Sequence, residues 1–106
     1  MGATSIGKVT VTTAGTPVRV TATSTPCQAI SLQALSTNTG KIYVGNIQAM
    51  SKTTLVGVLG VIAVPTSNTL PSASISQMSP AGLDASSLWL DADNSGEGVV
   101  VGLVQG

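Results

Sequence analysis

The chain has 106 residues, enough for one domain with a modest core, and its four basic residues balance its four acidic ones. Charged residues make up only 8% of the chain, and histidine is absent. This composition argues against a strongly basic nucleic-acid surface and excludes any catalytic mechanism that needs a histidine of this chain. The single cysteine cannot form an internal disulfide, which fits folding inside a cell.

The first elements expected along the chain are two β-strands. Residues 8–13 and 18–23 alternate aliphatic with polar side chains, as a half-buried strand does. The sequence Ala-Gly-Thr-Pro between them is typical of a turn, so we expect a first hairpin. Residues 1–7 lack the pattern of a signal peptide and are expected to form an N-terminal arm.

A second hairpin is expected over residues 29–45, with the polar segment 36–40 at its tip. Both strands alternate, so their aliphatic residues should share a face. These residues are Ile30, Leu32, Ala34, Ile42 and Val44. Tyr43 would then point away from the core, while Cys27, just before the hairpin, is expected to be a small buried hydrophobic residue.

The middle of the chain is less regular. Residues 46–54 are expected to form a loop. Residues 55–64 are apolar at nearly every position, which predicts one or two strands buried on both faces, with a bulge at Gly57 or Gly60. This run is too short to cross a membrane as a helix. Residues 65–82 contain three prolines and are expected to form a long loop or arm, with one short strand near residues 73–76.

A third hairpin is expected near the end, with strands over residues 86–93 and 99–105. Its aliphatic residues alternate in phase, and Trp89 faces away from them. Short, regularly spaced strands and the lack of any helical period predict an all-β fold. We therefore expect residues 1–106 to form one compact antiparallel β-sandwich or jelly-roll-like domain with irregular central loops.

Candidate chemical groups are few. Residues 91–96 match the start of a calcium-binding loop, with Asp91, Asp93 and Ser95 at ligand positions and Gly96 at the turn. Such a loop should end with a glutamate at position 102, where this chain has Gly102. A hairpin turn is therefore the preferred interpretation, and a weak cation site at a subunit contact is the alternative. We predict no enzyme activity, no catalytic residue, no cofactor and no metal.

The two aromatic residues suggest a contact surface. Tyr43 and Trp89 each lie opposite their strand's aliphatic face, which is consistent with a subunit interface, with partly buried core or with a ligand platform. The near-zero net charge favours association. The candidate interface residues are Tyr43, Leu55, Val58, Val61 and Trp89.

Two stretches resemble a known class of proteins. The run "GKVTVTTAGTPVRVTATSTPCQAISLQALSTNTGKIYVGN" (7–46) is similar to the N-terminal half of small virion proteins of tailed double-stranded DNA bacteriophages. The run "LWLDADNSGEGVVVGL" (88–103) is similar to their final hairpin. The segment 47–82 is longer and more apolar than the connection expected in that family.

The resemblance implies a structural role in the virion. It implies a capsid decoration (cement) protein that binds the outer capsid surface and bridges subunits of the major capsid protein. Such a protein would be made in the bacterial cytoplasm and would self-associate as a homotrimer, or else as a dimer, without nucleic acid or membrane partners. The alternatives are a tail- or head-fibre module that binds a host surface glycan, and a cellular β-sandwich binding domain.

Overall fold

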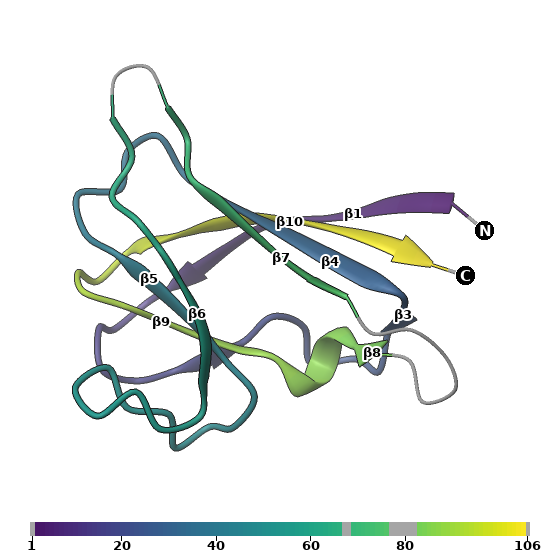
Figure 1. Ribbon diagram of the computed structural model, residues 1–106, viewed down its shortest axis with the longest axis horizontal. Helices are drawn as coiled ribbons and strands as arrows, with labels where there is room; N and C mark the ends of the chain where they lie inside the picture. Colours follow the sequence, from purple (N-terminus) through teal and green to yellow (C-terminus); the bar gives the residue numbers. More distant parts are fainter. Residues whose placement is uncertain (1, 67–68, 77–82, 106) are drawn as a thin grey trace.

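The computed structural model describes residues 2–66, 69–76 and 83–105, in which every regular element except one 3₁₀ turn is a β-strand (Figure 1). The elements are β1 (Gly2–Val11), β2 (Val18–Arg19), β3 (Pro26–Cys27), β4 (Ala29–Ala34), β5 (Ile42–Gly45), β6 (Val58–Ile62), β7 (Ser72–Ser76), β8 (Leu83–Asp84), η1 (Ala85–Ser87), β9 (Trp89–Ala92) and β10 (Glu97–Gln105). Within these residues, no helix has the length and apolar character needed to cross a membrane. The all-β prediction is confirmed.

The strands form two four-stranded antiparallel sheets, one in the order β1-β10-β4-β7 and the other in the order β2-β9-β5-β6, and a short β3-β8 ladder. The first strand pairs with the last, the second with the second last, and so on inward to β5 and β6. The chain is thus one long hairpin wound into two sheets, which is the jelly-roll topology. The predicted jelly-roll-like sandwich is confirmed.

None of the three expected hairpins forms. The connections 12–17, 35–41 and 93–96 each lead from a strand of one sheet to a strand of the other. The strand β1 pairs with β10, β4 with β10 and β7, and β9 with β2 and β5. A short polar connection can turn within a sheet or cross between two sheets, and the alternation of the flanking residues is the same in both cases.

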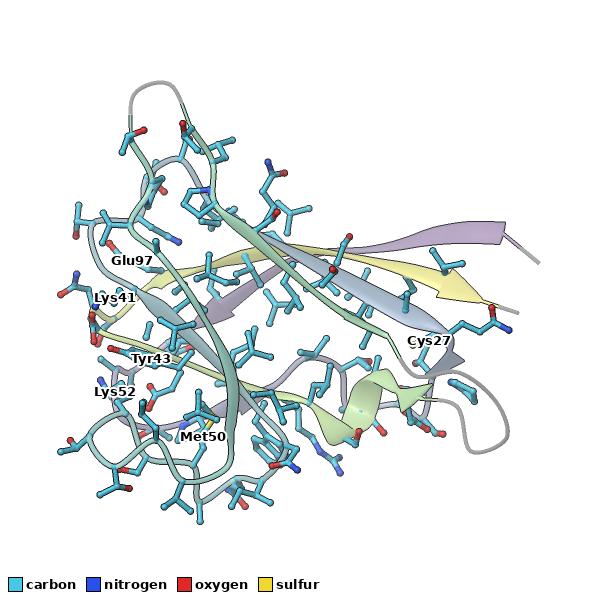
Figure 2. The ribbon with its side chains drawn as sticks, viewed as in Figure 1. Cys27, Lys41, Tyr43, Met50, Lys52 and Glu97 are labelled. Atoms are coloured by element: carbon cyan, nitrogen blue, oxygen red, sulfur yellow. The ribbon has the colours of Figure 1, made fainter. Side chains whose placement is uncertain are left out.

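Side-chain hydrogen bonds join these three connections at one end of the sandwich. Glu97 accepts from the backbone N–H groups of Thr39 and Gly40, at 2.7 and 3.0 Å. The N–H of Ala14 donates to the Ser95 hydroxyl at 2.9 Å, and Asn94 Nδ2 donates to the Thr39 hydroxyl at 3.0 Å. Figure 2 labels Glu97 at this end of the molecule. The polar residues that predicted tight turns therefore bind neighbouring connections, and this makes crossing between the sheets favourable.

Asn38 fixes the most buried of these contacts. Its Nδ2 donates to the carbonyl of Gly98 at 2.8 Å, and the N–H of Gly98 donates to its Oδ1 at 3.2 Å. The side chain therefore pairs with Gly98 as a neighbouring strand would. A Cβ at Gly98 would overlap the carbonyl oxygen of Val9, so only glycine lets β1 and β10 approach here.

Two of the expected loops are partly strand. Residues 2–7 do not form a separate arm, because they are the first part of β1 and pair with β10 from Gly2 opposite Gln105 onward. The segment 65–82 contains β7, which confirms the short strand expected near residues 73–76. Residues 77–82 of the expected loop lie outside the described residues.

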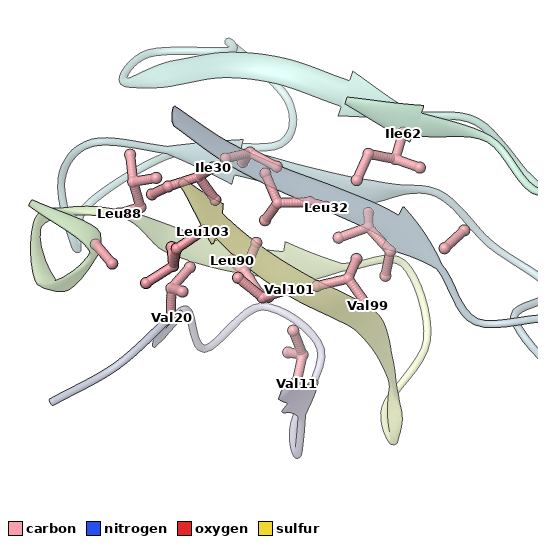
Figure 3. Packing of buried hydrophobic residues seen from close by; sticks show 14 of the residues in the cluster. Val11, Val20, Ile30, Leu32, Ile62, Leu88, Leu90, Val99, Val101 and Leu103 are labelled. Carbon is pink, nitrogen blue, oxygen red and sulfur yellow. The ribbon is translucent and has the colours of Figure 1, made fainter. Parts of the chain in front are cut away.

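Aliphatic side chains from alternate strand positions fill the space between the sheets (Figure 3). At most 1% of the surface of each of the following is exposed: Val11, Ile30, Leu32, Ile42, Val44, Ile62, Leu88, Leu90, Val99 and Val101. Burial of each such side chain contributes roughly 1.5–3 kcal/mol. The inward faces predicted for the strands at 29–35, 41–45, 86–93 and 99–105 are confirmed, although their pairing was not foreseen.

Candidate functional site

Most of the large exposed hydrophobic side chains lie on β6 or on the connections at its two ends. We call six of these residues the β6 surface: Ile47, Leu55, Val56, Leu59, Val61 and Val64, which are 41% to 58% exposed. The expectation that residues 55–64 are buried on both faces is wrong for the single chain, in which only Ile62 of this run is buried. The reason is position, because β6 is an edge strand of its sheet.

Strand register brings four of the five candidate interface residues together around β5. Tyr43 lies opposite Val61 of β6, and Gly45 lies opposite both Val58 of β6 and Trp89 of β9. The register shifts between Val44 and Gly45, so an irregularity in β6 falls between the two glycines at which a bulge was expected. Val61 belongs to the β6 surface, and the other three residues extend that surface across the sheet.

Leu55, the fifth candidate, adopts an unusual backbone conformation. Its φ is +62°, in the left-handed region that favours glycine and asparagine. A leucine there costs about 1–2 kcal/mol, yet half of its surface is exposed, so burial within the chain offsets little of that cost. Strain of this kind is typical of binding positions, where another molecule supplies the missing contact.

The connection 46–57, which includes Leu55, is held against the sheet by side-chain contacts (Figure 2). Met50 is buried over Gly45, where an added Cβ would lie 2.8 Å from the methionine sulfur. Lys52 Nζ donates to the carbonyl of Ala92 at 2.7 Å. The hydroxyl of Ser51 accepts from two backbone N–H groups within the connection. The expected loop therefore presents its apolar residues from a fixed platform.

Trp89 does not offer a free aromatic face. It is only partly exposed, and the guanidinium carbon of Arg19 lies 5.5 Å from the centre of its ring. This geometry is a cation–π contact between neighbouring strands. A sugar that stacks on Trp89 would have to displace Arg19 from one side of the ring, which weakens the ligand-platform interpretation.

Tyr43 is held as a neutral phenol. Partial burial raises its pKa, and the negative charge of Asp93, a hydrogen bond to that carboxylate and the charge of Asp91 raise it further. The hydroxyl therefore stays protonated at neutral pH and serves as a hydrogen-bond donor at the rim of the surface.

Asp84 and Glu97 each bind local backbone. Asp84 accepts from the Ser24 hydroxyl and from the N–H groups of Thr25 and Ser86, and these bonds hold its pKa well below the usual range. Burial of Glu97 favours its neutral form, but hydrogen bonds led by those from Thr39 outweigh burial and lower its pKa. Both carboxylates act as structural acceptors in the ionised form.

Residues 91–96, whose spacing resembles the start of a calcium-binding loop, do not form such a loop. Asp91 belongs to β9 and is buried, and its Oδ1 accepts from the N–H groups of Gly15 and Ala92 at 2.9 and 2.8 Å. Asp93 follows the strand and accepts from the N–H of Lys41 at 3.2 Å. Among the described residues, no group of three His, Cys, Asp or Glu side chains could hold a metal ion.

Cys27 lies inside the fold, as expected for a small hydrophobic residue. It is 5% exposed in β3 and belongs to the core cluster. Burial raises the pKa of its thiol, and the negative charge of Asp84 adds to that effect. The thiol is therefore protonated and shielded, which is the opposite of the state that metal binding or nucleophilic attack needs.

Four residues of the β6 surface were not predicted as interface residues. Leu59 is two residues from Val61, so strand alternation places both on one face. That face could have been predicted to be exposed only if the edge position of β6 had been known. Ile47, Val56 and Val64 lie in connections with no period, and no pattern in the sequence distinguishes them from core residues.

The chain was compared with known proteins at three levels. No protein-family model, no curated protein and no solved structure matches it. The resemblance to phage virion proteins therefore stays a prediction from the quoted residues, and the argument about function rests on the surface of the molecule.

Proposed function

We propose that this chain is a non-enzymatic structural protein of a bacteriophage virion, a capsid decoration (cement) protein. It would bind the outer capsid surface and bridge subunits of the major capsid protein. The observation that carries the proposal is the β6 surface, a set of exposed aliphatic side chains displayed by a rigid jelly roll.

The β6 surface suits a bridging role on physical grounds. A cement protein needs wide, lasting contacts and no reacting group, because its task is to raise the free energy of separating neighbouring capsid subunits. Exposed aliphatic patches of this size are typical of binding surfaces. A jelly-roll fold is shared by capsid and lectin domains, so the fold alone does not decide the function.

A second feature supports contact with a neighbouring molecule. The described parts of the connection from β6 to β7, residues 63–66 and 69–71, extend beyond both sheets at the top of Figure 1. The N–H of Thr66 donates to the carbonyl of Thr69 at 3.0 Å, and this hydrogen bond holds the two sides of the projection together. Val64 and Leu70 are about two-fifths exposed on it. Such a projection can reach a capsid subunit beside the one on which the domain sits.

The alternative role, a fibre-associated module that binds a host glycan, has less support. Sugar sites usually need an open aromatic face, and Arg19 covers one side of the only tryptophan. Copy number separates the two roles, because decoration needs on the order of hundreds of copies per particle whereas a fibre needs about a dozen.

The test is quantitative mass spectrometry of purified particles, followed by re-binding to capsids that lack the protein. We expect many copies per particle, and we expect Leu70→Lys to lower capsid occupancy. Val104→Lys is the matched control, because Val104 is equally exposed, at 42%, on the outer face of the other sheet. A dozen copies or fewer, or equal occupancy for both variants, would contradict the proposal.

A further inference from the structure

The free edge of β6 is guarded by neither charge nor proline, but only by its length of five residues and the register irregularity in its pair with β5. Edge strands present unpaired N–H and C=O groups, and soluble proteins usually guard them with charged residues, proline or short length. The run 55–64 contains neither a charged residue nor a proline. On one side β6 pairs with β5, and within the described residues no strand pairs with its other side.

The β6 surface is large enough to bind a partner. Its six side chains, each about half exposed, present on the order of 500 Å² of aliphatic area, and the largest apolar patch of a monomer, about 300–600 Å², is often functional. When two β6 edges pair, part of this area on each copy becomes buried between cross-strand neighbours, and the main-chain hydrogen bonds of the shared ladder add to the association.

The sequence of β6 is compatible with itself. In an antiparallel pair centred on Gly60, Leu59 of one copy lies opposite Val61 of the other, and Val58 lies opposite Ile62. An added Cβ at Gly60 meets no atom within 4 Å, so a small side chain at the centre of the pair has room. A neutral chain with a neutral edge also gives no charge repulsion between copies.

We propose that two copies of this chain associate through their β6 strands, related by a two-fold axis at Gly60. The sheets β2-β9-β5-β6 then join into one continuous eight-stranded sheet. The aliphatic residues of the two β6 surfaces lie on either side of the axis, and the strained, exposed Leu55 finds its contact there. The assembly is a dimer, not the homotrimer that the resemblance implies.

This inference concerns the isolated chain and does not depend on a role in a virion. If both hold, the second copy occupies the β6 edge, and the capsid contact falls to the projection at residues 63–66 and 69–71. A charged or polar partner protein is a poorer occupant of the β6 surface, because the run 55–64 offers it no charged group with which to pair. A dimer that fails to bind capsids would contradict only the proposed function. A monomer that binds capsids would contradict only the two-fold association.

The first test measures mass in solution by sedimentation equilibrium between 1 and 100 µM. We expect a dimer of twice the 10.5 kDa chain mass, with Kd in the micromolar range. Val61→Lys should raise Kd about 100-fold, since each dimer then holds two lysines at its apolar edge. Val100→Lys should leave Kd unchanged, because Val100 is equally exposed, at 43%, on the other sheet.

The second test reports the geometry. Directly opposed residues of an antiparallel pair have Cα atoms about 4.5–5.5 Å apart, within the range of a disulfide. In a Cys27→Ala background, Gly60→Cys should therefore form a covalent dimer with oxidised glutathione, while the exposed Val104→Cys should not. A monomer at 100 µM, a trimer mass, equal effects of Val61→Lys and Val100→Lys, or equal crosslinking would each overturn the proposal.

Discussion

The pairing of Asn38 with Gly98 should contribute strongly to stability. In Asn38→Ala, the buried N–H of Gly98 loses its acceptor, and its carbonyl keeps only a long bond of 3.3 Å from the N–H of Leu35. Leaving one buried donor unsatisfied costs about 1–3 kcal/mol, and the second lost bond adds about 1 kcal/mol or less. We therefore expect the free energy of unfolding to fall by about 2 kcal/mol.

Urea unfolding followed by the fluorescence of the single tryptophan measures this change. With an m value of about 1.3 kcal/mol/M, the midpoint should fall by about 1.5 M. Ser36→Ala, at an exposed position of the same connection, is the control and should shift the midpoint by less than about 0.4 M. All measurements use low micromolar protein, so that association does not add to the stability.

A second variant separates the two hydrogen bonds. Asn38→Asp keeps an acceptor for the N–H of Gly98. Its second carboxylate oxygen takes the place of the amide nitrogen, which lies 2.8 Å from the carbonyl oxygen of Gly98, so two acceptors then face each other. Its destabilisation should be larger at pH 7 than at pH 4, where protonation restores a donor. Equal midpoints for Asn38→Ala and Ser36→Ala would refute the reasoning.

Three further predictions follow from close approach, carboxylate bonding and burial. Gly98→Ala should destabilise the fold by about 3 kcal/mol or more in urea, because its Cβ meets backbone that cannot move aside, whereas Gly60→Ala in the monomer should change stability by less than about 0.5 kcal/mol. The pKa values of Asp84 and Glu97 are lowered in the folded chain, so each ionised carboxylate stabilises the fold above its ordinary pKa of 3.8 or 4.5. That stability is lost as the pH falls toward the folded pKa. The double variant Asp84→Asn/Glu97→Gln should therefore lose less stability than the native chain between pH 6 and 3. The thiol of Cys27 should react with a disulfide reagent about 100-fold faster in urea than in the native protein, and equal rates would contradict its burial.

The faces of the strands could be predicted from the sequence because alternation is a local property. Ile30 and Leu32 in β4, and Val99 and Val101 in β10, are inward by a period of two residues that needs no knowledge of the partner strand. The outward placement of Tyr43 follows from the same period.

The pairing of the strands could not be predicted from these patterns because it depends on distant residues. The connection 35–41 has the length and composition of a hairpin turn, yet it crosses to the other sheet. Its bonds go to Glu97 and Gly98, about 60 residues away in the chain. Local rules for turns do not contain this information.

The candidate site was predictable only in part for the same reason. The phase of Tyr43 and Trp89 predicted that they face outward, but only the register of β5 with β6 and β9 brings them beside Val61 and Val58. The left-handed backbone of Leu55 has no signature in the sequence, because leucine is among the residues least expected there.

The central position of β10 has a consequence for how the protein is made. This strand lies between β1 and β4, but a ribosome synthesises it after every other strand. Until residues 97–105 leave the exit tunnel, β1 has no partner strand and β4 has only β7. This sheet can therefore form only after residues 97–105 have been synthesised, and its folding should be slow because its pairs are far apart in sequence. During that interval neighbouring nascent chains on one messenger expose their β6 edges to each other, so expression at a low rate should improve the yield of correctly folded protein.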